Sequence, residues 1–315
     1  MLSNDQARLV PRTEFAGPLL SFDFPGLQIG VAEYDEGPTG CTVFHFPAGA
    51  ATAIDVRGGS VGKTGDYEWN HAVCLAGGSL YGLAAAAGVS EELFVRHDHS
   101  LKNFAMVSGA IIFDYGPRDN RIYPDLALGR AALRAARPNV FPLGRRGAGR
   151  SAGVGAVFDR AAAEPSGQAG AYRAIGPTKV AVFSVVNALG VVVDRQGRVV
   201  RGNRDATTGE RRPPLDEVER RLARGEPTSV PVGNTTLSVV VTNQKLSSRA
   251  LSQLARQVHS SMARIIQPFH TLMDGDVLYA VTTNEVEDAA LSPVALGIVA
   301  SELMWDAILT MVALV

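Results

Sequence analysis

The sequence predicts a layered α/β protein. Segments typical of strands and segments typical of helices follow one another in mixed order along the 315 residues. Some of the strand segments read as half-buried, whereas others are continuously apolar and so are expected to be covered on both faces. Hydrophobic residues make up 46% of the chain and charged residues 19%, which is a globular composition with enough apolar material for a sizeable core.

The first half of the chain begins with short strands and continues into helices. Residues 19 to 59 contain "LQIGVAEY" and "CTVFHF", which are rich in β-branched and aromatic residues and are bounded by Gly and Pro. The segment "NHAVCLAGGSLYGLAAAAGV" passes from an apolar run through Gly77, Gly78 and Ser79 into an Ala-rich helical pattern. A second helix is predicted in "YPDLALGRAALRAARP", between Pro124 and Pro138.

The second half is divided by a polar break. Residues 179 to 203 predict two strands and a hairpin, with Ser184 as the polar exception in an apolar run. Residues 201 to 233 are charged and marked by prolines, and they predict loop with one short helix in "LDEVERRLARG". A strand at 237–242, a helix at 247–266, a strand at 277–283 and a C-terminal helix are expected after the break.

Charge and composition exclude several function classes. Thirty basic and 31 acidic residues leave a net charge of −1, which is no footprint for nucleic acid or an anionic membrane. The first residues lack an apolar run of signal-peptide length, and Cys41 and Cys74 are too few for a disulfide framework, so a cytoplasmic protein is expected. Glu302 and Asp306 interrupt the apolar C-terminal stretch, which favours a buried core helix over a membrane span.

The most familiar motif in the chain is misleading. Gly149 to Gly153 matches G-x-S-x-G, in which Ser151 would be a nucleophile on a sharp turn between a strand and a helix. The flanking segments "FPLGRRGAG" and "VGAVFD" fit neither element. A glycine-rich loop that lets two backbones approach closely is the better interpretation.

A threonine at the end of the polar break offers sharper chemistry. In "GNTTLSVVVTN", a flexible segment meets an apolar strand at Asn234-Thr235-Thr236. If the Thr235 hydroxyl attacked the Asn234 carbonyl and water hydrolysed the resulting ester, Thr235 would become a new N-terminus. Its α-amine, with an ordinary pKa of about 7.7–8.0, could then act as the base for its own hydroxyl. The alternative is an ordinary junction between a loop and a strand.

Polar residues elsewhere could support this nucleophile. Asp274 and Asp276 in "FHTLMDGDVLYAV" share one face of an extended segment, so that one could accept a hydrogen bond from the hydroxyl while the other orients the amine. An Asp-Gly turn is the alternative. Asn187 ends a buried strand and could donate to an oxyanion or cap the strand. A metal site at His270, Asp274 and Asp276 lacks a further ligand, and His259 is expected to be a core histidine.

Several segments together resemble one family. "GLQIGVAEYDEGPTGCTV", "DVRGG", "CLAGGSLYGLAAAAGV", "GNTTLSVVVTN" and "QPFHTLMDGDVLYAVTT" are similar, in that order, to the L-aminopeptidase/D-esterase (β-aminopeptidase) family of self-cleaving hydrolases, and most of all to its nylon-oligomer hydrolases. The resemblance implies one αββα sandwich without a cofactor, cut between Asn234 and Thr235 into residues 1–234 and 235–315 and assembled as a homotetramer. It places the nucleophile at Thr235, the carboxylates at Asp274 and Asp276, and the active-site asparagine at Asn187.

Two positions depart from the family pattern. The stretch "GAGRSAGVGAVFD" has Ala156 where a lysine is expected, and Phe113 in "AIIFDYG" stands where the nylon hydrolases have a tyrosine. Tyr115, two residues on, would share a strand face with Phe113 and could substitute for the tyrosine. The expected activity is hydrolysis of linear amide oligomers. A β-aminopeptidase acting on short peptides, or a weakly active or inactive member that keeps the fold, remain alternatives.

Overall fold

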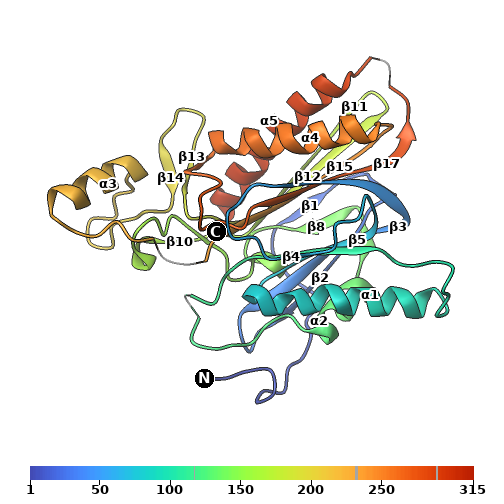
Figure 1. Ribbon diagram of the computed structural model, residues 1–315, viewed down its shortest axis with the longest axis horizontal. Helices are drawn as coiled ribbons and strands as arrows, with labels where there is room; N and C mark the ends of the chain where they lie inside the picture. Colours follow the sequence, from blue (N-terminus) through green and yellow to red (C-terminus); the bar gives the residue numbers. More distant parts are fainter. Residues whose placement is uncertain (117, 231–232, 289) are drawn as a thin grey trace.

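The strand β3 (Thr39–Val56) belongs to two stacked sheets in the computed structural model, which describes residues 1–116, 118–230, 233–288 and 290–315. Its first half pairs with β2 (Gln28–Tyr34) and β5 (Trp69–Ala76). Its second half pairs with β17 (Val277–Val286). One strand therefore ties the two sheets together (Figure 1).

The crossing point in β3 is fixed by a glycine. The register with β5 shifts between His45 and Ala50. Within this bend Gly49 has a φ of +71°, and a Cβ there would lie 2.2 Å from Nε1 of Trp69. Only glycine combines this backbone conformation with such a close contact, so the bend depends on it.

The first sheet holds the strand that begins at Thr235. Its order is β11-β12-β15-β17 followed by the second half of β3, and β15 pairs antiparallel with β12 but parallel with β17. The bounds are Gln168–Ile175 for β11, Thr178–Asn187 for β12 and Thr235–Gln244 for β15. The second sheet adds β6 (Val107–Ile111), β4 (Lys63–Thr64) and β7 (Arg137–Pro138) to β2, β5 and the first half of β3.

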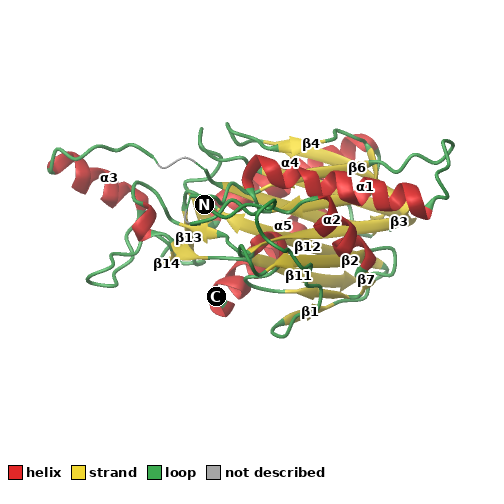
Figure 2. Cartoon of the chain, turned by 90° about the horizontal axis from the view of Figure 1, so that it is seen from below, coloured by secondary structure: helices red, strands yellow, loops and turns green. Residues whose placement is uncertain are grey.

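Helices cover the outer face of each sheet, as Figures 1 and 2 show. α4 (Ser248–Ser261) and α5 (Pro293–Leu314) pack on the first sheet, and α1 (Ala84–Arg96) and α2 (Leu126–Arg134) pack on the second. Three of these helices begin at an N-cap side chain that accepts a backbone N–H, namely Asp125 for α2, Ser247 for α4 and Ser292 for α5.

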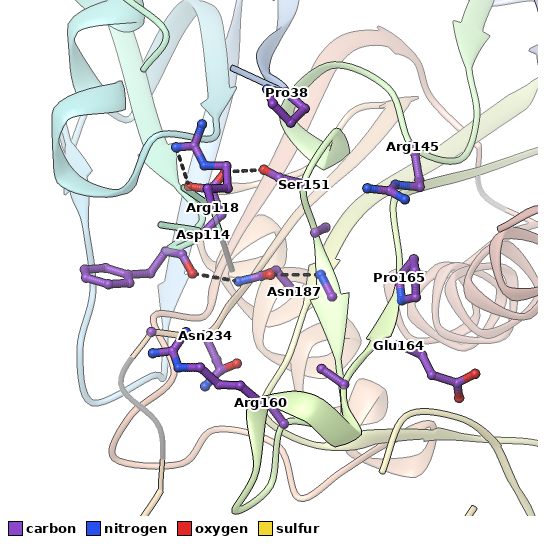
Figure 3. Close-up of a pocket in the computed structure, with 16 residues that line it drawn as sticks. Pro38, Asp114, Arg118, Arg145, Ser151, Arg160, Glu164, Pro165, Asn187 and Asn234 are labelled. Carbon is purple, nitrogen blue, oxygen red and sulfur yellow. Dashed lines mark hydrogen bonds and ion pairs between the residues drawn. The ribbon is translucent and has the colours of Figure 1, made fainter. Parts of the chain in front are cut away.

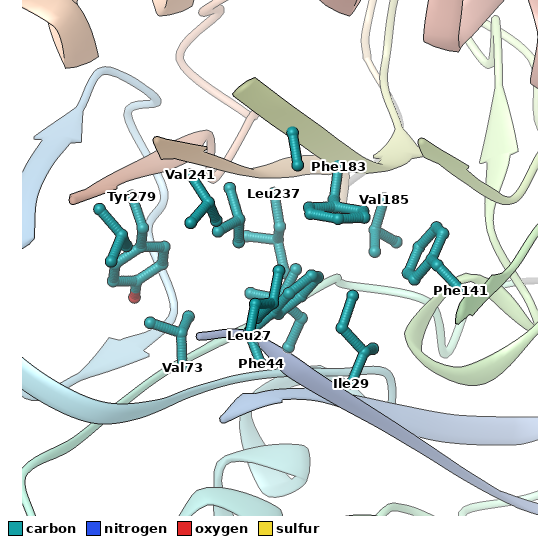
Figure 4. Packing of buried hydrophobic residues seen from close by; sticks show 14 of the residues in the cluster. Leu27, Ile29, Phe44, Val73, Phe141, Phe183, Val185, Leu237, Val241 and Tyr279 are labelled. Carbon is teal, nitrogen blue, oxygen red and sulfur yellow. The ribbon is translucent and has the colours of Figure 1, made fainter. Parts of the chain in front are cut away.

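The inner faces of the two sheets form a shared core (Figure 4). Phe183, Leu237 and Tyr279 project from the first sheet, and Phe44 and Val73 project from the second; all five are at most 1% exposed. The four layers are thus helix, sheet, sheet and helix, and the predicted αββα sandwich is confirmed.

Individual elements differ from the sequence predictions mainly at their ends. β15 begins at Thr235 and not at residue 237, because the polar Thr-Thr pair already pairs with β12. The helix expected to reach residue 266 ends at Ser261 and is followed by η4 (Met262–Arg264) and β16 (Ile266–Gln267). The strand β6 ends at Ile111, so residues 113 and 115 do not share a strand face, and that prediction was wrong.

The C-terminal helix and the polar break complete the chain. α5 is long and apolar enough to cross a membrane by length and composition alone, but half of its most apolar window is buried, and it packs on β11 and β12. The hairpin of β13 (Val191–Val193) and β14 (Val199–Arg201) leads into the break, where α3 (Pro214–Ala223) extends from the body (Figure 1). Residues 231 and 232 of the predicted tail lie outside the described residues.

The remaining short elements connect these layers. Their bounds are Leu19–Ser21 for β1, Ser79–Leu83 for η1, Val140–Pro142 for β8, Gly147–Gly149 for η2, Gly153–Val154 for β9, Arg160–Ala162 for η3 and Glu164–Pro165 for β10.

Candidate active site

The first residue of β15 lies between two other strands. Thr235 pairs with Asn187 at the end of β12, and Asn234 forms a bridge with Asp274, just before β17. β15 is rich in β-branched residues, which favour an extended backbone, and all of its residues are buried. The antiparallel pairing with β12 and the parallel pairing with β17 thus bring Asn187 and Asp274 to the Asn234–Thr235 peptide.

Two donors converge on the carbonyl oxygen of Asn234. The hydroxyl of Thr235 donates to it at 2.5 Å, and the backbone N–H of Gly275 donates to it at 3.0 Å. A Cβ at residue 275 would lie 2.7 Å from Oγ1 of Thr235, so a larger residue would crowd the hydroxyl. A fixed N–H that points at a carbonyl oxygen is the arrangement that stabilises an oxyanion when a nucleophile adds to the carbon.

Asp274 is a buried carboxylate with several donors. Its Oδ2 accepts hydrogen bonds from the backbone N–H and the hydroxyl of Thr271, and its Oδ1 accepts one from the N–H of Leu189 at 3.3 Å. Burial and the nearby charge of Asp276 raise the pKa of Asp274 to about 6, although the hydrogen bonds oppose the shift. A carboxylate with this pKa can take up a proton near neutral pH.

Asp276 holds the start of β15 in place. Its Oδ1 accepts the N–H of Thr236 at 2.7 Å, and its Oδ2 lies 3.2 Å from the backbone N and 3.0 Å from Nδ1 of His270. The ring of His270 in turn packs edge-on against His259 at 4.4 Å between centroids. His259 is buried and bonded to Asp55 at 2.9 Å, in agreement with a core position.

The hydrogen bond expected from the Thr235 hydroxyl to an aspartate is not among the contacts of the uncut chain. The hydroxyl donates instead to the carbonyl oxygen of Asn234, which is close because the Asn234–Thr235 peptide bond is intact. Asn187 is also engaged elsewhere. Its Oδ1 accepts the N–H of Gly153 at 3.0 Å, and its Nδ2 donates to the carbonyl of Phe113 at 3.2 Å. Besides the Thr235 hydroxyl, the donor found on the Asn234 oxygen is therefore the N–H of Gly275 and not Asn187.

Two cavities adjoin the Asn234–Thr235 peptide. One has a volume of about 310 Å³, and its lining includes Asn187, Asn234 and charged side chains (Figure 3). The other has a volume of about 450 Å³, and its lining is mainly apolar. Phe113, Gly233 and Asn234 line both, so this segment forms the wall between them. Space for a ligand thus exists on either side of Asn234.

The two positions that depart from the family pattern, Phe113 and Ala156, both line a cavity, whereas the expected substitute Tyr115 does not. Phe113 lines both cavities, and Ala156 lines the charged one. Tyr115 lines neither, and its hydroxyl donates to the carbonyl of Arg121 at 3.2 Å. Arg160, four residues after Ala156, contributes a cation to the same cavity.

Two contributions to the site, Gly275 and Arg160, were missed by the sequence analysis. His270 was considered only as a metal ligand, in the same segment "FHTLMDGD" that had drawn attention to the two aspartates. Nothing in the sequence marked Arg160.

The structure also shows the surroundings of the G-x-S-x-G motif at Ser151 and of the candidate metal ligand His270. Ser151 lines the charged cavity and donates to the buried carboxylate of Asp114, while His270 contacts Asp276 and not Ser151. Ser151 lies between the short elements η2 and β9 and not between a strand and a helix. Among the described residues, no group of three or more His, Cys, Asp and Glu side chains is arranged to hold a metal ion.

Comparisons with known proteins agree with this fold. The sequence profile of peptidase family S58 matches residues 22–314. The chain is 50% identical to the 6-aminohexanoate-oligomer endohydrolase of Paenarthrobacter ureafaciens over 97% of this chain and 89% of that protein. It is 49% identical to the enzyme of the same name from Kocuria sp. (strain KY2), over 96% and 88%. The solved L-aminopeptidase D-Ala-esterase/amidase of Ochrobactrum anthropi, described as a variant of the Ntn-hydrolase fold, superposes with a TM-score of 0.65 at 15% identity over 95% of this chain and 88% of that one.

Proposed function

We propose that this chain, which belongs to peptidase family S58 and is an amide-bond hydrolase, cuts itself between Asn234 and Thr235 and then uses Thr235 as an N-terminal nucleophile. Its substrates are linear amide oligomers of the 6-aminohexanoate type. The observation that carries the proposal is the pair of donors, Thr235 Oγ1 and Gly275 N–H, on the Asn234 carbonyl oxygen.

Self-cleavage begins at the Thr235 hydroxyl. Rotation of the side chain brings Oγ1 over the carbonyl carbon of Asn234, and Asp274 takes the hydroxyl proton. The C–O bond forms while the negative charge on the carbonyl oxygen is stabilised by Gly275 N–H. The C–N bond then breaks, the nitrogen of Thr235 takes a proton, and an ester remains. Water hydrolyses this ester and leaves Asn234 as a carboxylate.

Substrate hydrolysis repeats the same chemistry on a second amide. The free α-amine of Thr235 acts as the base for its hydroxyl, which attacks the substrate carbonyl. The substrate C–N bond breaks, its amine leaves with the proton, and water hydrolyses the acyl-enzyme. Gly275 N–H would serve as the oxyanion donor, and Asn187 lines the charged cavity that Asn234 also lines.

The aminopeptidase alternative needs a carboxylate that holds a free substrate amine. Asp114 and Glu164 are the carboxylates that line the charged cavity, and both are already bonded to arginines, Asp114 to Arg118 and Glu164 to Arg211. This engagement favours the oligomer hydrolase over the aminopeptidase. The homotetramer and the cytoplasmic location remain predictions of the family resemblance.

Denaturing electrophoresis with intact-mass analysis tests the proposal. Purified wild type should give fragments of 234 and 81 residues, and Thr235→Ala should remain a single chain of 315 residues without amidase activity. Thr236→Ala is the matched control, because it removes the neighbouring hydroxyl and should leave processing in place. An uncut wild type that hydrolyses no linear oligomer would refute the proposal and favour the inactive alternative.

A further inference from the structure

The charged cavity beside Asn234 has an excess of positive charge. Its described lining contains three arginines and two carboxylates, namely Arg118, Arg145, Arg160, Asp114 and Glu164. A lining with this balance attracts anions, and arginine is the side chain best suited to hold a carboxylate through paired hydrogen bonds.

Both carboxylates of this cavity are already neutralised. Asp114 accepts hydrogen bonds from the N–H of Gly78 at 2.9 Å, from Arg118 at 3.4 Å and from the Ser151 hydroxyl. Asp114 therefore presents little free charge to a ligand.

Glu164 is held from outside the cavity. Arg211 donates two hydrogen bonds to its carboxylate, at 2.6 and 2.8 Å, and the N–H of Gly202 donates a third at 2.8 Å. Figure 3 shows this carboxylate turned away from the cavity, whereas Arg145 points into it. Neither carboxylate of the lining therefore offers free negative charge to a ligand in the cavity.

Arg160 lies on the wall nearest the cleavage point. Figure 3 shows its side chain directed from η3 toward the wall that carries Asn234. A Cβ added at Gly116 would lie 1.3 Å from Nη1 of Arg160, so the guanidinium packs directly against the Gly116 backbone. A cation is thereby held on the side of the scissile peptide that faces the charged cavity.

The cavity on the other side of Phe113 has a different character. Val61, Leu80, Ile111 and Met273 line it, and no charged side chain does so among the described residues. Transfer of methylene groups from water to such a surface is favourable. Asn234 thus lies between an apolar cavity and a cationic one.

We propose that the cationic cavity binds the carboxylate end of the substrate through Arg145 and Arg160, and that the apolar cavity holds the polymethylene part of the acyl portion. This inference rests on the proposed function and gives the substrate a direction. In a linear ω-amino-acid oligomer, only the portion that leaves as the amine carries the terminal carboxylate. When Oγ1 of Thr235 bonds to the substrate carbonyl carbon and the C–N bond breaks, that portion departs from the arginine side with the proton on its nitrogen.

The kinetic test compares two substrates that differ in one group. A linear 6-aminohexanoate trimer with a free carboxylate and the same trimer ending in a carboxamide are assayed with the wild type, Arg145→Gln, Arg160→Gln and Arg249→Gln. The last is an exposed arginine on α4, outside both cavities, and is the control. The wild type should show a KM at least tenfold lower for the acid than for the amide. Each cavity variant should raise the KM for the acid about tenfold and leave the KM for the amide unchanged.

A binding experiment separates this inference from the proposed function. Titration calorimetry with 6-acetamidohexanoate and with its carboxamide measures recognition of the carboxylate without turnover, and electrophoresis on each variant confirms processing. Preferential binding of the acid that is lost in both cavity variants would support the arginine site even if no oligomer were hydrolysed. Equal affinity for acid and amide in the wild type, or equal effects of the variants on both, would overturn it.

Discussion

The pH dependence of self-cleavage follows from the pair of buried aspartates. Burial first, and then the charge of Asp276, raise the pKa of Asp274 from 3.8 to about 6. A rise of about 2 units corresponds to about 3 kcal/mol of extra cost for the charged form. If Asp274 is the base that takes the Thr235 proton, cleavage requires its ionised form. The rate should then rise with pH, with a midpoint near 6, and at pH 5 about a tenth of the molecules should be competent.

Replacing Asp276 with Asn tests this origin of the shift. The substitution keeps an oxygen that can accept the N–H of Thr236 but removes the negative charge beside Asp274. The pKa of Asp274 should fall but remain above its ordinary value, because burial persists. The midpoint of self-cleavage should then move to a lower pH, independently of any change in the maximal rate.

Cell-free synthesis provides the uncut chain for this measurement. Labelled protein is diluted into buffers from pH 4.5 to 8.5, and the loss of the 315-residue band is followed over time. Arg249→Gln serves as the control and should keep the wild-type midpoint. A wild-type rate that is flat between pH 5 and 8, or a midpoint that Asp276→Asn leaves unchanged, would refute Asp274 as the base.

Two further predictions concern residues near the cleavage point. Gly233 has a φ of +102°, and a Cβ there would lie 2.1 Å from Cδ1 of Phe113, so Gly233→Ala should slow self-cleavage at least tenfold. Adding Phe113→Ala removes the clash and should restore part of the cleavage rate, as measured by electrophoresis. No recovery would mean that the whole effect comes from backbone strain at residue 233. The raised pKa of Asp274 means that the folded chain binds more protons than the unfolded chain between pH 4 and 6, so this group's contribution to stability is present below pH 4 and is lost as the pH rises through 6. Asp274→Asn should therefore raise Tm at pH 7.5 by more than at pH 4, as calorimetry on a Thr235→Ala background would measure, and an equal change at both values would contradict the assignment.

Local sequence was sufficient for most elements of the fold. Continuous apolar runs predicted β12 and β15, flanking prolines predicted α2, and apolar residues at helical spacing predicted α4. The passage of β3 from one sheet to the other could not be predicted in the same way. It depends on the contact between Gly49 and Trp69, which are brought together only by pairing with β5.

The site was predicted as residue types and not as contacts. Thr235, Asp274 and Asp276 could be selected because each stands beside the start of a buried strand. Their partners depend on the parallel register of β15 with β17, where Leu237 lies opposite Val277. A shift of one residue would turn every side chain to the other face, and the sequence alone does not set that register. The Gly275 N–H is a backbone group, so no residue type could reveal it.

The close approach of two distant glycine segments gives the "DVRGG" motif a physical reason. A Cβ at Gly58 would lie 2.3 Å from both the carbonyl oxygen of Asp274 and the nitrogen of Asp276, so only glycine fits there. The same loop donates from Ser60 N–H to the Asp274 carbonyl at 2.8 Å and from Arg57 N–H to the Asp276 carbonyl at 3.1 Å. These bonds hold the backbone on both sides of Gly275, whose N–H must point at the Asn234 oxygen. The motif thus acts on the chemistry through the backbone, because it fixes the direction of the oxyanion donor without contributing a side chain to the site.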